Sequence, residues 1–231
     1  MIKGVIFDLD DTLIDTSDHI AGALKNVFIK NKKYLKVSLK KFLNVNKTEI
    51  ANLLKNKNLR INQVGYLIWF KMFETLKIDS SPFLINKCFN NFQNYILNHI
   101  SLKVGVSEIL GFLKTNDIKV AVLSNGSFDE KIKKIIAVKI DKKIDVLITS
   151  ELFKDDKPKP SSLIYLINKL GLKKTEVVYI GDSYKEDILL ARNLGIKTIY
   201  FNEKKDKKVY SCLTADNYFQ IMDILKLNYL S

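Results

Sequence analysis

The chain has 231 residues, 47% of them hydrophobic, and a formal net charge of +13, which suits one large domain, or one domain with an insertion, around a packed core. No apolar run approaches the length of a membrane span, and the first strand begins too close to Met1 to leave room for a signal peptide, so we expect a cytoplasmic protein that does not enter the membrane. The two cysteines, Cys88 and Cys212, lie far apart and outside any paired motif, which excludes a disulfide framework and a zinc knuckle.

The first predicted element is a strand over residues 5–7 that ends in a cluster of aspartates. Its continuous apolar run is typical of a strand buried on both faces. Asp8 and Asp10 follow, and because side chains alternate along a strand, both carboxylates are expected on the same side. Such charges repel each other unless a cation or a proton lies between them, and Mg2+ favours carboxylate oxygens while keeping waters that a phosphate can displace. The alternative is a strand followed by an acidic turn, with Asp11 and Thr12 opening the next element.

Residues 16–97 are expected to form a helical insertion. Apolar residues recur there at intervals of three and four, which predicts four or five helices and no strand. Lys and Arg far outnumber Asp and Glu in this segment. An excess of positive charge beside an acidic metal site suits an anionic substrate. A solvated helical surface nevertheless accounts for most of these lysines. The chain has no run of five basic residues and no alternation of basic and aromatic residues, so we expect no nucleic-acid partner.

From Gly105 onwards, strands and helices alternate. Strands are predicted at residues 119–123, 146–149, 177–180 and 197–201. Helices are predicted near residues 107–114, 127–136, 163–170, 183–194 and 218–225. This alternation predicts an α/β fold with a doubly wound parallel sheet, Rossmann-like, which the helical insertion interrupts after the first strand. The core would therefore comprise residues 1–15 and 98–231.

Chemically reactive side chains follow the strands of this predicted core. They are Asp8 and Asp10, Ser124, Lys157 and Asp182. Because the loops at the carboxyl ends of parallel strands converge on one rim, we expect these groups to meet. The carboxylates would hold Mg2+, while Lys157 and Ser124 would neutralise and orient a phosphoryl group. A free carboxylate behind phosphorus can form an aspartyl-phosphate, and a second carboxyl can protonate the leaving oxygen and then accept a proton from water.

Four segments resemble, in order, the four motifs of the haloacid dehalogenase-like hydrolases. They are residues 8–12 (DLDDT), 124–126 (SNG), 157–160 (KPKP) and 181–187 (GDSYKED). The resemblance covers the whole chain, and the helical insertion looks like the cap of the first cap class of that superfamily. It implies a Rossmann-like catalytic core, an all-helical cap domain, Mg2+ as cofactor and a small phosphorylated metabolite as substrate.

The resemblance also implies the catalytic and metal-binding roles of the aspartates. Asp8 would be the nucleophile and a metal ligand. Asp10 would be the general acid and base, and it would bind the metal through its backbone carbonyl. Asp182 would ligate Mg2+, and Asp187 would support the metal through water or through the motif lysine.

A phosphate-binding set follows from the same resemblance. Thr12 and Ser124 would hold the phosphoryl oxygens, and the side chain of Asn125 would touch the same group. Lys157 would bridge the nucleophile and the phosphate. We prefer Lys157 to the neighbouring Lys159 because the family pattern is Lys-Pro-x-Pro.

The presence or absence of an aspartate at the position of Asp10 distinguishes the branches of the superfamily. Dehalogenases lack this second aspartate and use no Mg2+, so the presence of Asp10, Asp182 and Asp187 argues against dehalogenation. The residues after Asp10 look like those of the phosphatases rather than the mutases. We therefore predict a Mg2+-dependent phosphatase that acts through an aspartyl-phosphate. The alternatives are a phosphosugar mutase, a phosphonate-cleaving enzyme that would need a cap lysine for a Schiff base, and a catalytically silent binding member, against which the intact residue set argues.

Overall fold

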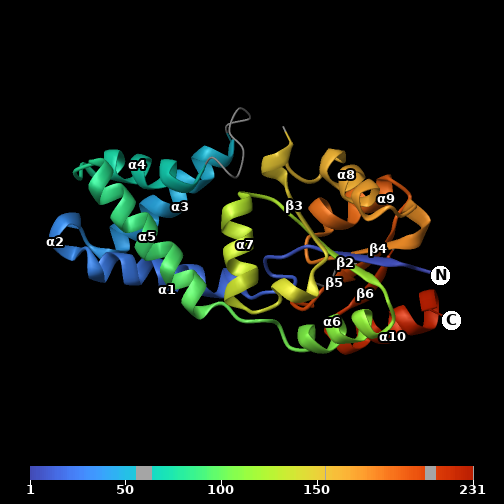
Figure 1. Cartoon of the computed structure of the whole chain (residues 1–231). Coiled ribbons are helices and arrows are strands. Elements are labelled where there is room, and N and C mark those ends of the chain that lie inside the picture. Colours follow the sequence, from blue (N-terminus) through green and yellow to red (C-terminus); the bar gives the residue numbers. More distant parts are fainter. Residues whose placement is uncertain (56–63, 154, 206–211, 231) are drawn as a thin grey trace. The chain divides into compact units, whose positions relative to one another are not determined.

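The computed structural model describes residues 1–55, 64–153, 155–205 and 212–230, and the chain divides into two compact units. The core unit comprises Met1–Asp15 and Ser101–Ser231, and the helical unit comprises Thr16–Ile100. All six strands that the structure describes belong to the core unit (Figure 1). Among the described residues, no helix combines the length and the apolar character that a membrane span requires.

The sheet of the core unit is parallel throughout and has the order β3-β2-β1-β4-β5-β6. Its strands are β1 (Gly4–Phe7), β2 (Lys119–Ser124), β3 (Val146–Thr149), β4 (Val177–Gly181), β5 (Lys197–Phe201) and β6 (Leu213–Ala215). The central strands β1 and β4 are buried along their whole length, as their uninterrupted apolar sequences require. The predicted parallel sheet is therefore confirmed.

The edge strand β6 is absent from the sequence-based prediction. It has three residues, and two of them, Leu213 and Thr214, are exposed. Neither a continuous apolar run nor a long alternation marks such a strand, so its pairing with β5 becomes visible only in the folded chain.

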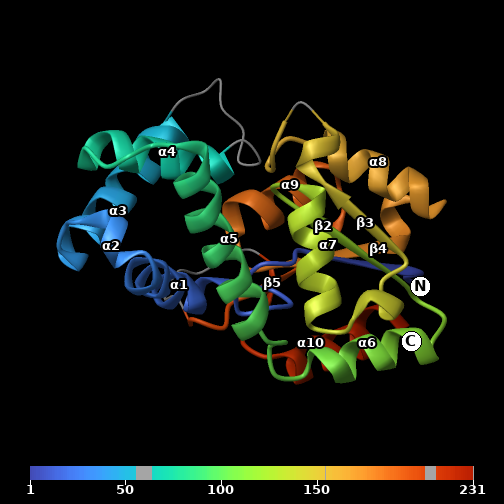
Figure 2. The same ribbon diagram turned by 60° about the vertical axis from the view of Figure 1, so that its left-hand side comes forward.

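Helices cover both faces of the sheet. They are α6 (Val106–Thr115), α7 (Phe128–Ala137), α8 (Ser161–Leu170), α9 (Leu189–Asn193) and α10 (Tyr218–Leu225). On one face α8 and α9 pack against alternate strand residues such as Ile6, Ala121 and Tyr179, whereas α6 and α10 lie together on the other (Figures 1 and 2). The sheet is thus doubly wound. The helix predicted after Asp182 begins as a π-helical turn, Tyr184–Ile188, which continues into α9.

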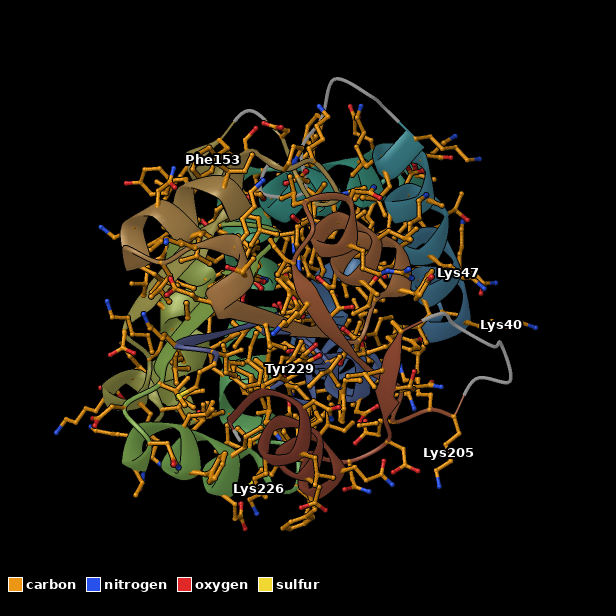
Figure 3. The ribbon with its side chains drawn as sticks, turned by 90° about the vertical axis from the view of Figure 1, so that its right-hand side faces the viewer. Lys40, Lys47, Phe153, Lys205, Lys226 and Tyr229 are labelled. Carbon is orange, nitrogen blue, oxygen red and sulfur yellow. The ribbon has the colours of Figure 1, made fainter. Side chains whose placement is uncertain are left out.

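The helical unit has a hydrophobic core of its own. Its helices are α1 (Thr16–Lys30), α2 (Lys32–Leu35), α3 (Leu39–Lys55), α4 (Val64–Leu76) and α5 (Pro82–His99). Aromatic rings pack together in it, and the ring of Phe42 lies 5.5 Å from that of Phe28 and 6.4 Å from that of Trp69. Within the described residues this unit contains helices and no strand, as its periodicity predicts. Lys40 and Lys47 of α3 are exposed and extend outward (Figure 3), which fits a solvated basic surface.

Tyr218 connects α10 to the loop that follows β1 through a hydrogen bond. Its hydroxyl is buried and donates a hydrogen bond of 2.8 Å to the backbone carbonyl of Thr12, which is itself fully buried. Since a buried carbonyl without a donor is costly, this bond should hold the loop in place.

Replacing Tyr218 by Phe should lower the free energy of unfolding by about 1–3 kcal/mol, because the carbonyl of Thr12 loses its donor. Tyr165→Phe on α8 is a matched control in the same unit: its ring is 46% exposed, so the same chemical change should stay within about 0.5 kcal/mol. Urea unfolding followed by circular dichroism measures both. Equal losses in the two variants would contradict the role given to Tyr218.

Candidate active site

The carboxyl ends of the three central strands bring the motif residues together. Asp8 follows β1 directly, and its backbone amide continues the pairing with β4 by donating to the carbonyl of Ile180 at 2.9 Å. Ser124 is the last residue of β2, and Asp182 follows the last residue of β4. One cavity of about 240 Å³ is lined by Asp8, Asp10, Asp11, Ser124, Asn125, Lys157, Asp182, Ser183, Glu186 and Asp187.

Lys157 lies at the centre of this site. It comes from the loop between β3 and α8, and its ammonium group is buried. The Nζ atom donates to Oδ1 of Asp8 at 2.5 Å and to Oδ1 of Asp187 at 2.6 Å. Burial lowers the pKa of Lys157, but the carboxylates of Asp187 and Asp8 outweigh it and raise that pKa well above its usual value. The ammonium is therefore a permanent positive charge between two buried acids.

The side chain of Asn125 holds the loop that carries Lys157 through a hydrogen bond. Its Oδ1 accepts a hydrogen bond of 2.8 Å from the backbone amide of Lys157, and its Nδ2 donates to Oε2 of Glu186 at 3.2 Å. Glu186 lines the cavity but was not singled out from the sequence. Burial raises its pKa. Ser124 also lines the cavity, and it is 2% exposed.

Three carboxyl groups are close enough to share one cation. Asp8, Asp182 and Asp187 each offer an oxygen, and these oxygens lie within 4.8 Å of one another. Burial, with help from Asp187, raises the pKa of Asp8 to about 8 and that of Asp182 to about 6. One ammonium, that of Lys157, faces this group, so the set is short of positive charge when ionised. An oxygen-only donor set of this kind, in which Asp8 and Asp187 are buried and Asp182 is half-buried, fits Mg2+.

Thr12 lies behind Asp182 and is not among the residues that line the cavity. Its hydroxyl donates to Oδ1 of Asp182 at 3.1 Å and accepts from the backbone amide of Asp182 at 3.0 Å. The side chain is fully buried. In this structure the hydroxyl therefore holds Asp182 in place, whereas the motif resemblance assigned it to a phosphoryl oxygen.

Asp10 faces helix α7 rather than the other carboxylates. Lys131 Nζ donates to its Oδ2 and Lys134 Nζ to its Oδ1, each at 2.7 Å. Burial raises the pKa of Asp10, but these two ammonium groups outweigh the burial and hold that pKa well below its usual range. Sequence reasoning missed both lysines, although they stand one and four residues after Glu130 in the predicted capping box. In a chain with 38 basic residues, that spacing alone does not distinguish them.

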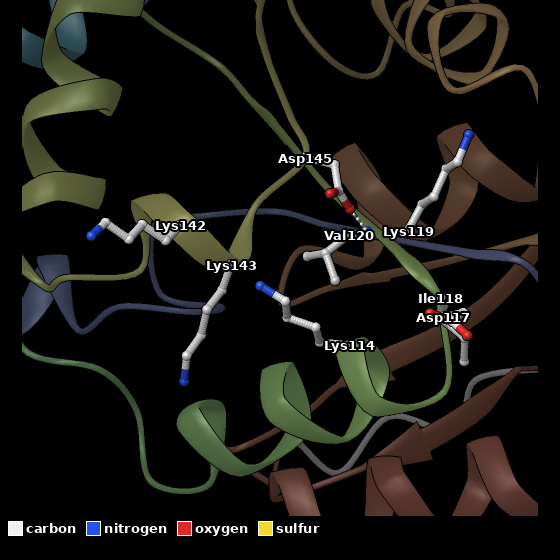
Figure 4. A pocket seen from close by; sticks show the side chains of 8 residues that line it. All are labelled: Lys114, Asp117, Ile118, Lys119, Val120, Lys142, Lys143 and Asp145. Carbon is white, nitrogen blue, oxygen red and sulfur yellow. Dashed lines mark hydrogen bonds between the residues drawn. The ribbon is translucent and has the colours of Figure 1, made fainter.

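A second cavity of about 240 Å³ lies beside the start of β2, at the opposite end of that strand from Ser124 (Figure 4). It contains none of the motif residues. Its lysines point in different directions (Figure 4). Lys119 donates to the carbonyl of Leu170 at 2.8 Å. The carboxylate of Asp145 accepts from the backbone amide of Val120 at 2.7 Å. This cavity therefore lies apart from the motif residues at the carboxyl-terminal rim.

Comparison with known proteins agrees with the motifs. A family model described as haloacid dehalogenase-like hydrolase matches residues 5–201. The chain is 29% identical over 231 residues to a glyceraldehyde 3-phosphate phosphatase of Methanocaldococcus jannaschii, with 98% of each chain covered. It is 26% identical over 211 residues to the N-acylneuraminate-9-phosphatase of Homo sapiens, with 87% of this chain and 83% of that one covered.

Solved structures share the fold. A 2-haloacid dehalogenase of Pseudomonas syringae superposes with a TM-score of 0.76 at 22% identity, over 98% of this chain and 99% of that one. A HAD phosphatase of Thermococcus onnurineus superposes with a TM-score of 0.72 at 20% identity, over 97% and 98%. The family model spans most of the chain, and the four motifs meet at one rim of the expected sheet. The chain therefore belongs to the haloacid dehalogenase-like hydrolases.

Proposed function

We propose that this protein is a Mg2+-dependent phosphatase that hydrolyses a small phosphorylated metabolite through an aspartyl-phosphate on Asp8. The observation that carries the proposal is the position of Asp8, whose carboxyl group is held by the ammonium of Lys157 at 2.5 Å at the floor of the acidic cavity. A carboxylate fixed in this way can attack a phosphoryl group bound above it. The phosphatase names of the relatives support the same reaction class.

The metal would be held by Asp8 and Asp182, with Asp187 close enough to contribute directly or through water. The backbone carbonyl of Asp10 is a further proposed ligand, as the motif resemblance implies. When bound, Mg2+ would neutralise the phosphoryl oxygens and align the phosphorus with the attacking carboxylate. Thr12 supports this arrangement, because its hydroxyl group forms two hydrogen bonds with Asp182.

The reaction then proceeds in two half-reactions. Ser124, Asn125 and Lys157 bind the phosphoryl oxygens, and a carboxylate oxygen of Asp8 attacks phosphorus. The bond from phosphorus to the substrate oxygen breaks, and Asp10 gives that oxygen its proton; for Asp10 to carry this proton, the bound substrate must weaken its pairing with Lys131 and Lys134. Asp10 then takes a proton from water, which attacks the aspartyl-phosphate and releases inorganic phosphate with the Asp8 carboxylate restored.

The helical unit, Thr16–Ile100, corresponds to the cap of this class of enzyme. We therefore assign the selection of the substrate to this unit. The relatives are named for phosphates of a three-carbon aldehyde and of an acylated sugar acid, which supports a small phosphorylated metabolite as substrate. A putative beta-phosphoglucomutase of Thermotoga maritima has the same fold at 18% identity with a TM-score of 0.72. The fold alone does not separate hydrolysis from phosphoryl transfer. A cytoplasmic location and the absence of a nucleic-acid partner stay predictions from the sequence.

The first test is phosphate release from a panel of small phosphate monoesters and p-nitrophenyl phosphate, with Mg2+ and with EDTA. We expect release that requires Mg2+ and that falls at least about 10³-fold in Asp8→Asn, because an amide cannot attack phosphorus. Asp223→Asn is the matched control: its side chain is 71% exposed on α10, and activity should be unchanged. Release that persists in EDTA or in Asp8→Asn would contradict the proposal. Conversion of a sugar phosphate without phosphate release would favour the mutase.

The network around Lys157 can be tested through Gly181 at the end of β4. A Cβ at this position would lie 2.5 Å from Cγ and 2.6 Å from Cβ of Asp187, so Gly181→Ala must displace that side chain. We expect kcat to fall about 10²-fold, since Asp187 orients Lys157 through their 2.6 Å contact. The unfolding midpoint should fall as well.

Gly111→Ala on α6 is the control for that substitution. No heavy atom lies within 4 Å of the added carbon, so activity should not change. Stability should rise by about 0.5–1 kcal/mol, because alanine favours a helix interior more than glycine does. Steady-state kinetics and thermal melts measure both variants. A fully active Gly181→Ala would show that the position of Asp187 is not critical.

A further inference from the structure

The loops that carry Ser124 and Lys157 are joined by one buried hydroxyl group, that of Ser150. This serine is 1% exposed and begins the turn that follows β3. Its Oγ accepts a hydrogen bond of 3.0 Å from the backbone amide of Gly126 and donates one to Oδ1 of Asp156. Gly126 lies two residues after Ser124, and Asp156 lies directly before Lys157. The hydroxyl therefore bridges the two loops with both its donor and an acceptor site.

The position of Ser150 follows from the pairing of β2 with β3. Ser124 lies opposite Thr149 in the last pair of that register, so the ladder ends where the two loops begin. Gly126 has a φ of +109°, which turns the chain away from the direction of the strand. A buried amide needs an acceptor, and the side chain of Ser150 supplies it beyond the end of the ladder.

The side chain of Asn125 makes a second connection between the same loops. Its Oδ1 accepts from the backbone amide of Lys157 at 2.8 Å, and its Nδ2 donates to the backbone carbonyl of Lys157 at 3.4 Å. Two consecutive residues, Asp156 and Lys157, are thus attached to the loop after β2. Attachment at two consecutive residues fixes the direction of the backbone as well as its place. That direction determines where the side chain of Lys157 begins.

We propose that Ser150 is a positioning residue whose hydroxyl sets the spacing between Ser124 and Lys157, so that both meet the same phosphoryl group. The inference rests on the proposed function, in which these two side chains bind the phosphoryl oxygens. Ser150 is not among the residues that line the cavity, so it acts through the two loops and not on the substrate. Without its hydroxyl, the buried amide of Gly126 loses its acceptor, and the loops must shift to satisfy it.

The test is Ser150→Ala, with Ser162→Ala as the matched control. Ser162 is also 1% exposed, but its hydroxyl has no hydrogen-bond partner within the part of the chain that the structure describes. In Ser150→Ala, kcat for p-nitrophenyl phosphate should fall about 10–100-fold, because a small displacement of a positioned group has an effect of this size. The inhibition constant of inorganic phosphate should rise about 3–10-fold, because the contact with the ammonium group weakens. Ser162→Ala should keep both wild-type values.

Activation by Mg2+ separates positioning from a general loosening of the site. The proposed metal ligands Asp8 and Asp182 follow β1 and β4, whereas the hydrogen bonds of Ser150 lead to the loops after β2 and β3. The Mg2+ concentration that gives half-maximal activity should therefore not rise in Ser150→Ala. A rise in parallel with the loss of kcat would overturn the proposal, as would wild-type values of kcat and of phosphate inhibition.

A double-mutant cycle tests the connection to the loop of Lys157. Asp156→Ala removes the acceptor of the Ser150 hydroxyl. The double variant should therefore lose no more kcat than Ser150→Ala alone, and multiplied losses would contradict the proposed connection. Ser150→Cys nearly preserves the side-chain volume but has only a weak donor, so its kinetics should resemble those of Ser150→Ala. Wild-type kinetics in Ser150→Cys would show that volume, and not the hydrogen bonds, is responsible.

Failure of the proposed function gives a different result. If the wild-type protein releases no phosphate from any member of the panel, the phosphatase assignment is wrong. The same cycle of Ser150→Ala and Asp156→Ala is then measured on urea-unfolding midpoints. Non-additive shifts would support the bridge between the two loops, and additive shifts would refute it.

Discussion

The contact of the Lys157 ammonium with Asp8 and Asp187 is the interaction on which the rest of the site depends. Each of these charges is buried, and a buried charge without a partner is destabilising by several kcal/mol. Removing any one of the three would therefore leave a buried charge without its partner or make a carboxyl group take up a proton. They come from β1, from the loop after β3 and from the turn after β4, so the pairing requires those three segments to converge.

Asp8, the proposed nucleophile, and Asp10, the proposed acid, are two residues apart but lie in opposite electrostatic surroundings. Around Asp8, three carboxylates face one ammonium, and burial raises the pKa of Asp8 to about 8. Around Asp10, two lysines more than offset burial and lower its pKa. These directions are the reverse of those that a nucleophilic carboxylate and a protonated acid require, so a cation beside Asp8 and a weaker pairing at Asp10 are needed before the two groups can take those roles. The first surroundings fit a divalent cation, whereas in the second the ammonium groups of Lys131 and Lys134 already pair with the carboxylates of Asp10 and Glu130.

Much of the fold was predictable because strong local signals agreed with it. The apolar runs of β1, β2 and β4, each followed by a polar motif, predicted a parallel sheet with reactive groups at one rim, and the helical period predicted the insertion. The edge strand β6 was not predicted, since it has three residues, two of them exposed, and its pairing with β5 forms only in the folded chain. The position of Thr12 behind Asp182 was not predictable either, because a hydroxyl one turn after Asp8 can face the cavity or the next strand, and packing decides between them.

The amino-acid order alone determined which chemical groups follow the strands and in what order: aspartates after the first buried strand, then a hydroxyl, an ammonium and an acidic turn. Those groups could be read because each follows an element with a recognisable hydrophobic pattern. Tertiary structure decided which ammonium group pairs with which carboxylate. Lys131 and Lys134 stand in a helix whose composition resembles any solvated basic helix, yet they reach Asp10 across 121 and 124 residues of sequence. The pairing depends on how α7 packs against the loop after β1. No local pattern of residues predicts a contact between segments that lie so far apart in the sequence.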